Sequence, residues 1–404
     1  MELYAGLPYW IVKNPFYDYF NPLKKDYTAD VAIIGAGLTG ALIAYELGRL
    51  GINCCVVDKR SIGTGHSATG MALLQYETDT PLCRLIDQVG EKAAVATYKA
   101  SLQAITDLEK VFTRTHVHPE FERLPSVCYA TSDEDKALLE TEYKTRKKHR
   151  LPAELFSARE LFRNCRFEAE GALVNKEAAQ IDTYKATVGL LKYVMNEMQI
   201  PVFTHTEIKR WQATPRGCEL MTDKGYVIEC NYMIVATSFE AGPFLPRPVT
   251  RQTTAYALVS HPVDTRWLWP ERSLIWETAD PHLSIRTAGR NRIIIASYED
   301  SPAEAQPSTT LSKEKIRLLE KKFMKLFPHF IFTSEMAWSG PSSTTPDGLP
   351  YIGPWPGCER MYFALGYGRN SVPYAMIAAQ LIGKSLRRQP DERMNVFGFH
   401  RRIH

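Results

Sequence analysis

A glycine-rich hexamer near the start of the chain has the residue types and the spacing that bind a nucleotide pyrophosphate. Gly35, Gly37 and Gly40 occupy its first, third and sixth positions. The first glycine permits a tight turn, the second lets main-chain amides approach the phosphates, and the third lets a helix pack closely on a strand. Asp58 follows near the offset of about 20 residues at which a carboxylate accepts a hydrogen bond from a ribose hydroxyl. These residues predict a site for NAD or FAD, and the carboxylate disfavours the 2′-phosphate of NADP.

The elements around the hexamer are those that such a site requires. Residues 30–34 form a short apolar run typical of a buried parallel strand, and residues 38–50 have the periodicity of a helix that Gly51 closes. Residues 53–57 form a second apolar run. This order would aim the helix N-terminus, with its free amides and partial positive charge, at the phosphates. The alternative is that the glycines form only a turn in another α/β fold.

The rest of the chain mixes helical and strand-like segments without an internal repeat or a long polar linker. Four short runs between residues 201 and 229 predict a meander, and residues 253–297 are rich in further strand-like runs. The aromatic and proline-rich segment 7–27 is expected to pack along the body. Helices are expected at residues 86–114, 133–149, 183–198, 313–327 and 372–388.

The composition is that of a folded soluble protein. Of the 404 residues, 45% are hydrophobic and 23% are charged, and the formal net charge is only +4. The short basic run 146–150 is interpreted as a solvated helix end, so no nucleic-acid partner is expected. The N-terminus lacks a secretory signal, and the apolar window 31–48 fits a strand and a helix better than a membrane span. We therefore expect a cytoplasmic protein that does not bind membranes.

The cysteines and histidines do not have metal-ligand spacing. The eight cysteines include no Cys-x-x-Cys pair, which favours reduced, mostly structural thiols. His116 and His118 form the only close histidine pair and lack nearby acidic or thiol partners. We expect no metal site.

Three separated motifs resemble those of the D-amino-acid oxidase superfamily of flavoproteins. They are the hexamer together with the segment 59–71, the segment 345–353, which reads Thr-Pro-Asp-Gly-Leu-Pro-Tyr-Ile-Gly, and the turn 366–371. The superfamily includes glycine oxidase, sarcosine oxidase and gamma-glutamylputrescine oxidase, and Pro-Tyr-Trp at residues 8–10 looks most like the last of these. The resemblance spans nearly the whole chain and selects FAD over NAD.

The resemblance implies an α/β fold in which two parts interleave along the chain. One part is a discontinuous Rossmann-like FAD-binding domain, and the other is an α+β substrate domain built on an antiparallel sheet. The expected boundaries are 1–85, 155–248 and 331–404 for the FAD-binding domain, and 86–154 and 249–330 for the substrate domain.

The resemblance also implies which residues contact FAD. The segment 65–71 would pass close to the pyrophosphate and the flavin, and Ile208 would lie near the adenine. The turn 366–371 and the following helix N-terminus would stabilise negative charge on the pyrimidine edge of the reduced flavin. The expected contacts are Gly35, Gly37, Leu38, Thr39, Gly40, Asp58, Lys59, Arg60, Gly65, His66, Ser67, Ala68, Thr69, Gly70, Met71, Ile208, Ala236, Thr237, Gly366, Gly368, Arg369, Asn370 and Ser371.

Three departures from the family pattern bear on the chemistry. D-amino-acid and glycine oxidases bind the substrate carboxylate through an arginine whose counterpart here is Ser342. Sarcosine oxidase attaches its flavin to a cysteine, and none lies between residues 338 and 347, so a noncovalent FAD is expected. The lysine that activates oxygen in the sarcosine enzymes has no counterpart in residues 292–297, which places rapid reaction with oxygen in doubt.

The candidates for catalysis are Arg286, His66 and Tyr367. Arg286 could anchor an anionic substrate group, or it could instead tie its hairpin to a neighbour. His66 could act on the substrate, lie near a phosphate or simply pack. Residues 75–77 could line the substrate pocket, or Glu77 could be a buried structural carboxylate.

The expected activity is oxidation of a C–N bond in an amine or an N-substituted amino acid. A hydride would pass to flavin N5, and water would hydrolyse the resulting imine. The expected partners are a small-molecule substrate and oxygen or another electron acceptor. One alternative is a flavin dehydrogenase that passes electrons to a carrier, and another is a non-catalytic scaffold with a flavin-binding fold.

Overall fold

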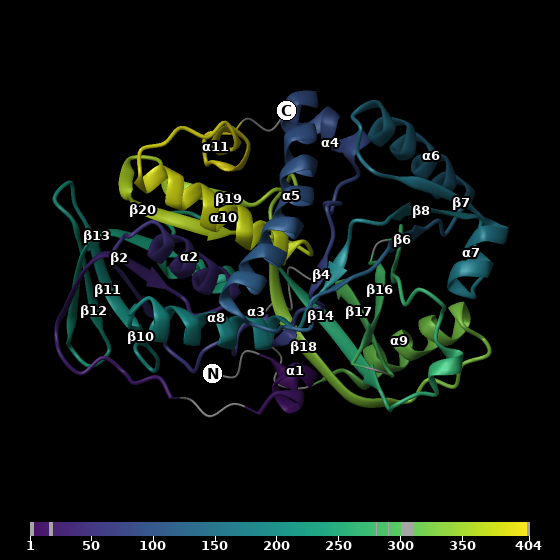
Figure 1. Cartoon of the computed structure of the whole chain (residues 1–404), viewed down its shortest axis with the longest axis horizontal. Helices are drawn as coiled ribbons and strands as arrows, with labels where there is room; N and C mark the ends of the chain where they lie inside the picture. Colours follow the sequence, from purple (N-terminus) through teal and green to yellow (C-terminus); the bar gives the residue numbers. More distant parts are fainter. Residues whose placement is uncertain (1–3, 16–18, 280, 290, 300–310, 402–404) are drawn as a thin grey trace.

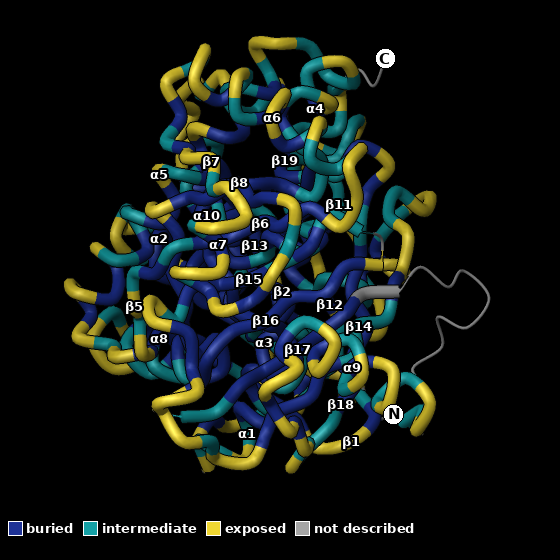
Figure 2. Tube along the Cα trace, turned by 90° about the vertical axis from the view of Figure 1, so that its right-hand side faces the viewer, coloured by how far each residue is buried: buried dark blue, intermediate teal, exposed yellow. Residues whose placement is uncertain are grey.

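Two large β-sheets with helices on their faces form the described part of the chain (Figure 1). The computed structural model describes residues 4–15, 19–279, 281–289, 291–299 and 311–401. Figure 2 shows that the strands of both sheets are largely buried, while exposed residues lie mainly on outer helices and loops. This arrangement confirms the α/β fold class.

The first sheet contains the predicted strand, turn, helix and strand. β2 (Tyr27–Ile34) and β3 (Cys54–Val57) are parallel neighbours connected through α2 (Leu38–Arg49). The last four residues of β2 and all of β3 are buried, as expected for parallel strands covered on both faces. Strands β10, β13 and β20 extend the parallel order, and β19 pairs antiparallel with β20. Their bounds are Val202–Phe203 for β10, Val227–Val235 for β13, Tyr351–Trp355 for β19 and Cys358–Leu365 for β20.

Four helices share one core on one face of this sheet (Figure 1). α2 packs against α8 and α10, and α10 packs in turn against α5. Together with the parallel strand order, this layer confirms the Rossmann-like part of the fold. The three further helices are α5 (Glu91–Thr115), α8 (Thr183–Glu197) and α10 (Ser371–Leu386).

The predicted meander is correct for three of its runs and wrong for the first. β11 (Ile208–Ala213), β12 (Cys218–Thr222) and β13 pair antiparallel in sequence. β10 instead pairs parallel with β3, because α8 carries the chain across the sheet and leaves Val202 beside the edge of β3. β13 is one long strand whose start pairs with β12 and whose end pairs with β20.

The helix predicted at residues 86–114 is two helices. α4 (Leu82–Val89) ends at Gly90, and α5 begins with Glu91. Gly90 has φ +83°, a left-handed conformation that few residues other than glycine adopt. The apolar periodicity continues across this turn, which is why the sequence pattern did not reveal the break.

The second sheet is the predicted antiparallel one and has nine strands. Its order is β1, β18, β14, β17, β16, β15, β6, β8 and β7, and the pairing of β15 with β6 is its only parallel one in the described residues. α9 (Lys313–Leu326) packs on β14 and β17. The strand bounds are Ala5–Gly6, Ser334–Thr344, Arg251–Ser260, Arg292–Glu299, Leu283–Ala288, Leu274–Glu277, Ser126–Tyr129, Gly171–Asn175 and Glu154–Ser157 in that order.

The proposed domain boundaries differ from a division by sheets. β7, β8 and β18 belong to the nine-stranded sheet, although the boundaries assign them to the FAD-binding part. The division therefore stays a proposal. The remaining elements are α1 (Tyr9–Lys13), α3 (His66–Thr69), β4 (Leu73–Leu74), β5 (Glu122–Arg123), α6 (Asp133–Lys148), α7 (Ala158–Cys165), β9 (Ala179–Gln180), the 3₁₀ helices η1 (Ser238–Phe244) and η2 (Thr265–Trp267), and α11 (Arg393–Phe397).

A buried ion-pair network corrects the interpretation of the basic run. Arg146, at the end of α6, is only 3% exposed and donates to Glu142 at 2.7 Å and to Glu77 at 3.0 Å. Glu142 also accepts hydrogen bonds from the Leu82 and Cys83 amides at the start of α4. The neighbours of Arg146 in this run are exposed or half-buried, as predicted. Glu77 is therefore a buried structural carboxylate, and together with Gln75 it also lines the small inner cavity described below, so both readings of residues 75–77 stay open.

Candidate cofactor and substrate site

A cavity of about 280 Å³ lies where β2, β3 and β13 end, and we call it the cofactor cavity. Five separate segments of the chain and Thr183 form its walls, and they include most of the expected cofactor contacts. These are Gly35, Gly37, Leu38, Thr39, Asp58, Lys59, Arg60, Gly65, His66, Ser67, Gly70, Ile208, Ala236, Thr237 and Ser371, together with the catalytic candidate Tyr367.

The three glycines of the hexamer have the geometry that their predicted roles require. Gly35 has φ +114°, and a Cβ there would lie 2.5 Å from the carbonyl oxygen of Ala236. A Cβ on Gly40 would overlap the carbonyl oxygen of Gly35, so only glycine lets α2 approach β2 this closely. A Cβ on Gly37 would lie 3.3 Å from Ser67 Oγ, at the cavity wall.

Two helix N-termini face the cofactor cavity without side-chain caps of their own. α2 starts after Gly37, and α10 starts after Asn370, and neither N-cap side chain accepts a hydrogen bond from the helix. By contrast, Ser132, Ser157 and Asp182 cap the helices that they precede. The Leu38 amide donates to Ser67 Oγ at 3.0 Å, and the other amides at these two helix starts, with the partial positive charge of the helix dipole, suit a pyrophosphate and a reduced flavin.

Asp58 holds the main chain on both sides of it at the end of the cavity next to β3. Its Oδ2 accepts a hydrogen bond from the Ala36 amide and its Oδ1 accepts one from the Arg60 amide, both at 2.8 Å. Burial raises the pKa of this carboxyl above its ordinary value. Lys59 and Arg60 both pair with Glu240 on η1, which forms a polar end wall. The contact of Asp58 with a ribose stays a prediction.

Buried polar atoms on the walls show that the cavity fits a polar ligand. Thr237 Oγ1, His66 Nδ1 and the Tyr367 hydroxyl are buried and have no hydrogen-bond partner among the described residues. Such atoms are costly unless a ligand or water pairs with them. Burial lowers the pKa of His66 and raises that of Tyr367, so both side chains are neutral near pH 7. The glycine turn, the free helix ends and these atoms together fit FAD.

The segment from α3 to Ala72 is held by side chains from four distant parts of the chain. Buried donors reach four of its carbonyl oxygens at 2.7–3.0 Å, and Ala72 itself has φ +58°. The donors are Thr183 Oγ1 to Ser67, Trp338 Nε1 to Thr69, Trp10 Nε1 to Gly70 and the Arg286 guanidinium to Met71. We call these four side chains the carbonyl clamp. The clamp explains why Trp10 is buried, as expected for the described part of the segment 7–27, of which residues 16–18 lie outside the described residues.

Arg286 belongs to this clamp rather than to a cavity wall. It is 3% exposed, and besides Met71 it donates to the carbonyl oxygens of Ala72 and Ile181. Its guanidinium lies over the Trp10 ring, 5.1 Å from the centroid. Burial lowers its pKa to about 10. Arg286 lines none of the three cavities described here, so its position favours the structural alternative over substrate anchoring.

We expect Trp10→Phe to lower the free energy of unfolding by about 1–3 kcal/mol, because the Gly70 carbonyl loses its buried donor. The phenyl ring keeps most of the packing beneath Arg286. Urea unfolding of the FAD-loaded protein measures this loss. Tyr19→Phe is the matched control, because the Tyr19 ring is 64% exposed and should leave the stability unchanged. Equal stabilities of the two variants would contradict the role of the Trp10 indole.

A small inner cavity adjoins a larger outer cavity, and two of its wall residues are chain neighbours of cofactor-cavity residues. Met71 and Asn370 line the inner cavity, while their neighbours Gly70, Ala72 and Ser371 line the cofactor cavity. The inner cavity is about 20 Å³, and it shares four wall residues with the outer cavity of about 950 Å³. The shared residues are Thr78, Asp79, Trp276 and Arg369.

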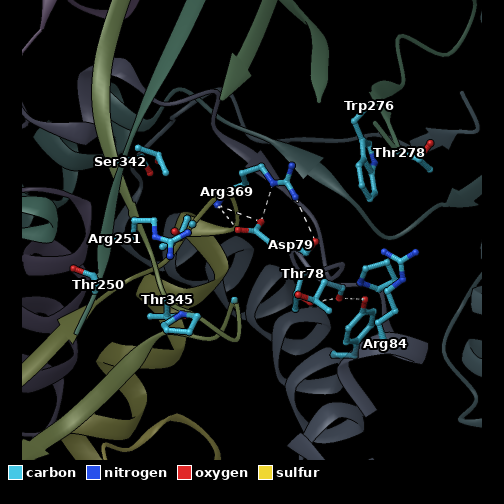
Figure 3. Close-up of a pocket in the computed structure, with 18 of the residues that line it drawn as sticks. Thr78, Asp79, Arg84, Thr250, Arg251, Trp276, Thr278, Ser342, Thr345 and Arg369 are labelled. Carbon is cyan, nitrogen blue, oxygen red and sulfur yellow. Dashed lines mark hydrogen bonds and ion pairs between the residues drawn. The ribbon is translucent and has the colours of Figure 1, made fainter. Parts of the chain in front are cut away.

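Arg369 stands at the junction of the inner and outer cavities (Figure 3). Its Nε donates to Asp79 at 2.9 Å, and its Nη1 lies 2.9 Å from His282 Nε2. The neighbouring Gly368, with φ +55°, has no room for a Cβ beside the Asp79 carboxylate. Arg369 lines the inner and outer cavities rather than the cofactor cavity, and its expected contact with FAD stays a prediction.

Seven other expected cofactor contacts do not line the cofactor cavity: Gly40, Ala68, Thr69, Met71, Gly366, Gly368 and Asn370. Of these, Met71 and Asn370 line the inner cavity and Gly368 lines the outer one. A Cβ at Gly366 would collide with the Thr345 side chain. The Thr69 side chain occupies the space in which a Cβ at Gly340 would lie. Sequence reasoning did not find the residues that the second sheet and its neighbours bring to the outer cavity. These include Thr250, Arg251, Thr253, Trp276 and Thr278, whose only sequence signal was their place in a strand-rich region.

Neither a metal centre nor a membrane span is found in the described residues. No group of three histidine, cysteine, aspartate or glutamate side chains there could hold a metal ion. No described helix combines the length and the apolar character that crossing a membrane requires. All eight cysteines lie within the described residues as free thiols, six of them buried.

Comparisons with known proteins identify the family. The family model "FAD dependent oxidoreductase" matches residues 30–384. Over 94% of its length the chain is 21% identical to the probable oxidoreductase OrdL of Haemophilus influenzae, with 87% of that protein covered. Glycine oxidase from Geobacillus kaustophilus is 23% identical, over 89% of this chain and 93% of the length of that protein. A crystal structure of glycine oxidase from the same organism has a TM-score of 0.77, over 94% of this chain and 100% of the crystallised chain. L-proline dehydrogenase from P. horikoshii has a TM-score of 0.78 at 17% identity, over 92% of this chain and 97% of its own. The match across nearly the whole chain shows that this protein is an enzyme of the FAD dependent oxidoreductase family.

Proposed function

We propose that this enzyme oxidises a C–N bond of an amine or of an N-substituted amino acid, with noncovalently bound FAD. The observation that carries the proposal is that the same two main-chain segments, around residues 70–72 and 370–371, contribute walls to both the cofactor cavity and the inner cavity. The cofactor cavity fits FAD, Met71 and Asn370 beside its walls line the inner cavity, and the outer cavity, which shares four wall residues with the inner one, would give a substrate access. No cysteine lines the cofactor or inner cavity among the described residues, which supports noncovalent binding.

The chain's own residues would position the reactants rather than act as strong acids or bases. When bound, FAD supplies the capacity to accept a hydride equivalent. The N-terminus of α10 would stabilise negative charge on the flavin, and the carbonyl clamp would hold the segment that faces it. The inner cavity has room for about one water molecule, which keeps the reacting carbon poorly solvated.

Ser342 supports an amine over a simple α-amino acid. It lines the outer cavity on β18 at the place where glycine oxidase is expected to carry a carboxylate-binding arginine. The similar proteins named glycine oxidase and L-proline dehydrogenase act on amino acids, so the general chemistry of the class is retained. Because Ser342 stands in place of the carboxylate-binding arginine, an anionic group of the substrate would bind somewhere other than beside residue 342.

A dehydrogenase that passes electrons to a carrier is the second candidate function. No lysine lines the inner or outer cavity among the described residues, and residues 293–296 of β17 are buried hydrophobic side chains. The side chain that would activate oxygen in the sarcosine enzymes therefore has no replacement on these walls.

Anaerobic mixing of the purified protein with a panel of amines and amino acids tests the proposed function. We expect a yellow protein whose flavin absorbance bleaches with at least one amine and recovers with an electron acceptor. Peroxide yield in air then separates an oxidase from a dehydrogenase. A colourless protein that does not bind FAD, or a flavin that no amine reduces, would overturn the proposal.

A further inference from the structure

We propose that Arg251, Arg247 and Arg84 form a binding site for an anionic group at the far end of the substrate. All three line the outer cavity, and we call them the rim arginines. This inference rests on the proposed function and names the substrate class: an amine that carries a carboxylate or phosphate several bonds away from the oxidised C–N bond. The anionic group would pair with guanidinium donors at the cavity mouth.

Strand register places Arg251 on the same side of the sheet as Ser342. Thr253 on β14 pairs directly with Ser342 on β18, and Arg251 pairs with Thr344. All four residues line the outer cavity, because residues two apart on a strand face the same side. Arg251 therefore lies about 7 Å further along the sheet than Ser342. Figure 3 shows both side chains on this wall.

The displacement sets the length of the substrate. At the Ser342 position the side chain is too short to reach an α-carboxylate as an arginine would. The first long cation on the same face is Arg251, so an anionic group would bind at a place displaced along the sheet from the Ser342 position. A ligand that spans this distance needs additional atoms between its amine and its anionic group. The volume of about 950 Å³ accommodates such a ligand, whereas an amino acid as small as glycine would leave most of it empty.

The other two rim arginines come from segments whose main chain is constrained. Arg247 lies between Pro246 and Pro248, which restrict the main chain on both sides of it. Arg84 comes from α4, whose first amides are held by Glu142 in the buried network. Two different parts of the chain thus hold cations at the mouth of one cavity.

The rim arginines are the uncompensated charges of the outer cavity. Its walls also include Arg146 and Arg369, but each of these pairs with a carboxylate. The wall carboxylate Glu277 accepts hydrogen bonds from Lys322 and from Tyr129. Arg84, Arg247 and Arg251 are exposed and form no ion pair among the described residues. An anion at the mouth would meet a positive field without displacing an existing partner.

Ligand binding to the FAD-loaded enzyme tests the site without turnover. Glutarate and propyl phosphate serve as anionic probes, with 1,5-pentanediol as the neutral one, in isothermal titration calorimetry. We expect an anionic probe to bind, added salt to weaken it, and Arg251→Gln to weaken it about 10- to 100-fold. Arg216→Gln is the control, because Arg216 is exposed in the turn between β11 and β12 and should leave binding unchanged.

The outcomes separate this inference from the proposed function. Binding of glutarate alone assigns a carboxylate, binding of propyl phosphate alone assigns a phosphate, and either supports the site. Binding of neither probe, equal binding of 1,5-pentanediol, or equal losses in Arg251→Gln and Arg216→Gln would overturn it. With an anionic amine that reduces the flavin, Arg251→Gln should raise KM with little change in kcat, because the contact is remote from the reacting bond. Failure of every amine to bleach the flavin would count against the proposed function alone, since the calorimetry needs no turnover.

Discussion

Arg146→Met is expected to lower the free energy of unfolding by about 3–5 kcal/mol, because it leaves two carboxylates buried without their cation. Arg146 is 3% exposed and makes charge-assisted hydrogen bonds to Glu142 and Glu77. Its guanidinium also lies against the rings of Tyr76 and Tyr98, with 5.3 Å and 5.6 Å to their centroids. Methionine keeps the apolar contact with these rings, so the loss reports mainly on the charge. Urea unfolding at pH 8 measures it.

The same variant should show a characteristic pH dependence. Burial alone would raise the pKa of Glu142, but Arg146 and the amides of Cys83 and Leu82 outweigh it and hold this pKa below its ordinary value. Without Arg146, burial dominates and the folded-state pKa rises above the unfolded value of about 4.3. A carboxyl with a raised folded-state pKa destabilises the fold increasingly as pH rises through that range. The deficit of Arg146→Met should therefore be smaller at pH 5 than at pH 8.

Two further variants keep this interpretation falsifiable. Lys147→Met changes the adjacent exposed cation and should alter stability by less than about 0.5 kcal/mol. Adding Glu142→Gln to Arg146→Met removes one unpaired charge and should recover part of the loss. A deficit for Arg146→Met as small as that for Lys147→Met, or no recovery in the double variant, would show that water rather than Arg146 stabilises these carboxylates.

Arg146 also illustrates why a basic run misleads when it is read along the sequence. The other four residues of the run, 147–150, are three cations and one histidine in exposed or half-buried positions. The run as a whole therefore indicates a solvated helix end. Which member turns inward depends on Glu77, which lies 69 residues away and reaches α6 only in the folded chain. Local composition carries no information on that pairing.

The dinucleotide motif was predictable because its determinants are local. Gly35, Gly37 and Gly40 must satisfy a turn and a helix-to-strand contact within six residues, and their φ angles and missing Cβ atoms agree with those roles. The carbonyl clamp was not predictable in the same way. Trp10 and Gly70 are joined by one hydrogen bond across 60 residues, and Arg286 reaches Met71 across 215. Only the packing of the N-terminal segment and the second sheet in the folded chain brings these donors to the carbonyl oxygens of Gly70 and Met71.

The arginines that line the outer cavity could not be predicted from the sequence for the same reason. The motif around Ser342 indicated that a carboxylate-binding arginine was missing, but not where a replacement would lie. The register of β14 against β18 supplies that information, because it pairs Thr253 with Ser342 and thereby brings Arg251 to the same face. Antiparallel register is set by contacts between distant strands, so it could not be inferred from either strand alone.

The second large effect is expected for Gly40→Ala, which should abolish stable FAD binding. Its Cβ would overlap the carbonyl oxygen of Gly35, a main-chain atom that can move only if the turn moves. Displacing the turn would shift the main-chain amides around Gly37 away from the predicted place of the pyrophosphate, so a loss of affinity of at least about 100-fold is expected, equivalent to about 3 kcal/mol. FAD titration of the apoprotein, followed by flavin fluorescence, measures the affinity. Gly242→Ala is the matched control, since a Cβ at Gly242 meets no atom within 4 Å.

If Gly40→Ala does not fold, Gly37→Ala still tests the same site. A Cβ on Gly37 would lie 3.3 Å from the Ser67 hydroxyl, and a small movement of that side chain relieves the contact. The free energy of unfolding of the apoprotein should therefore change by less than about 1 kcal/mol. The methyl group would nevertheless occupy the path by which main-chain amides approach the pyrophosphate, and FAD affinity should fall at least about 10-fold. Wild-type FAD affinity in Gly37→Ala, measured on protein with wild-type unfolding behaviour, would show that the cofactor does not lie over this turn.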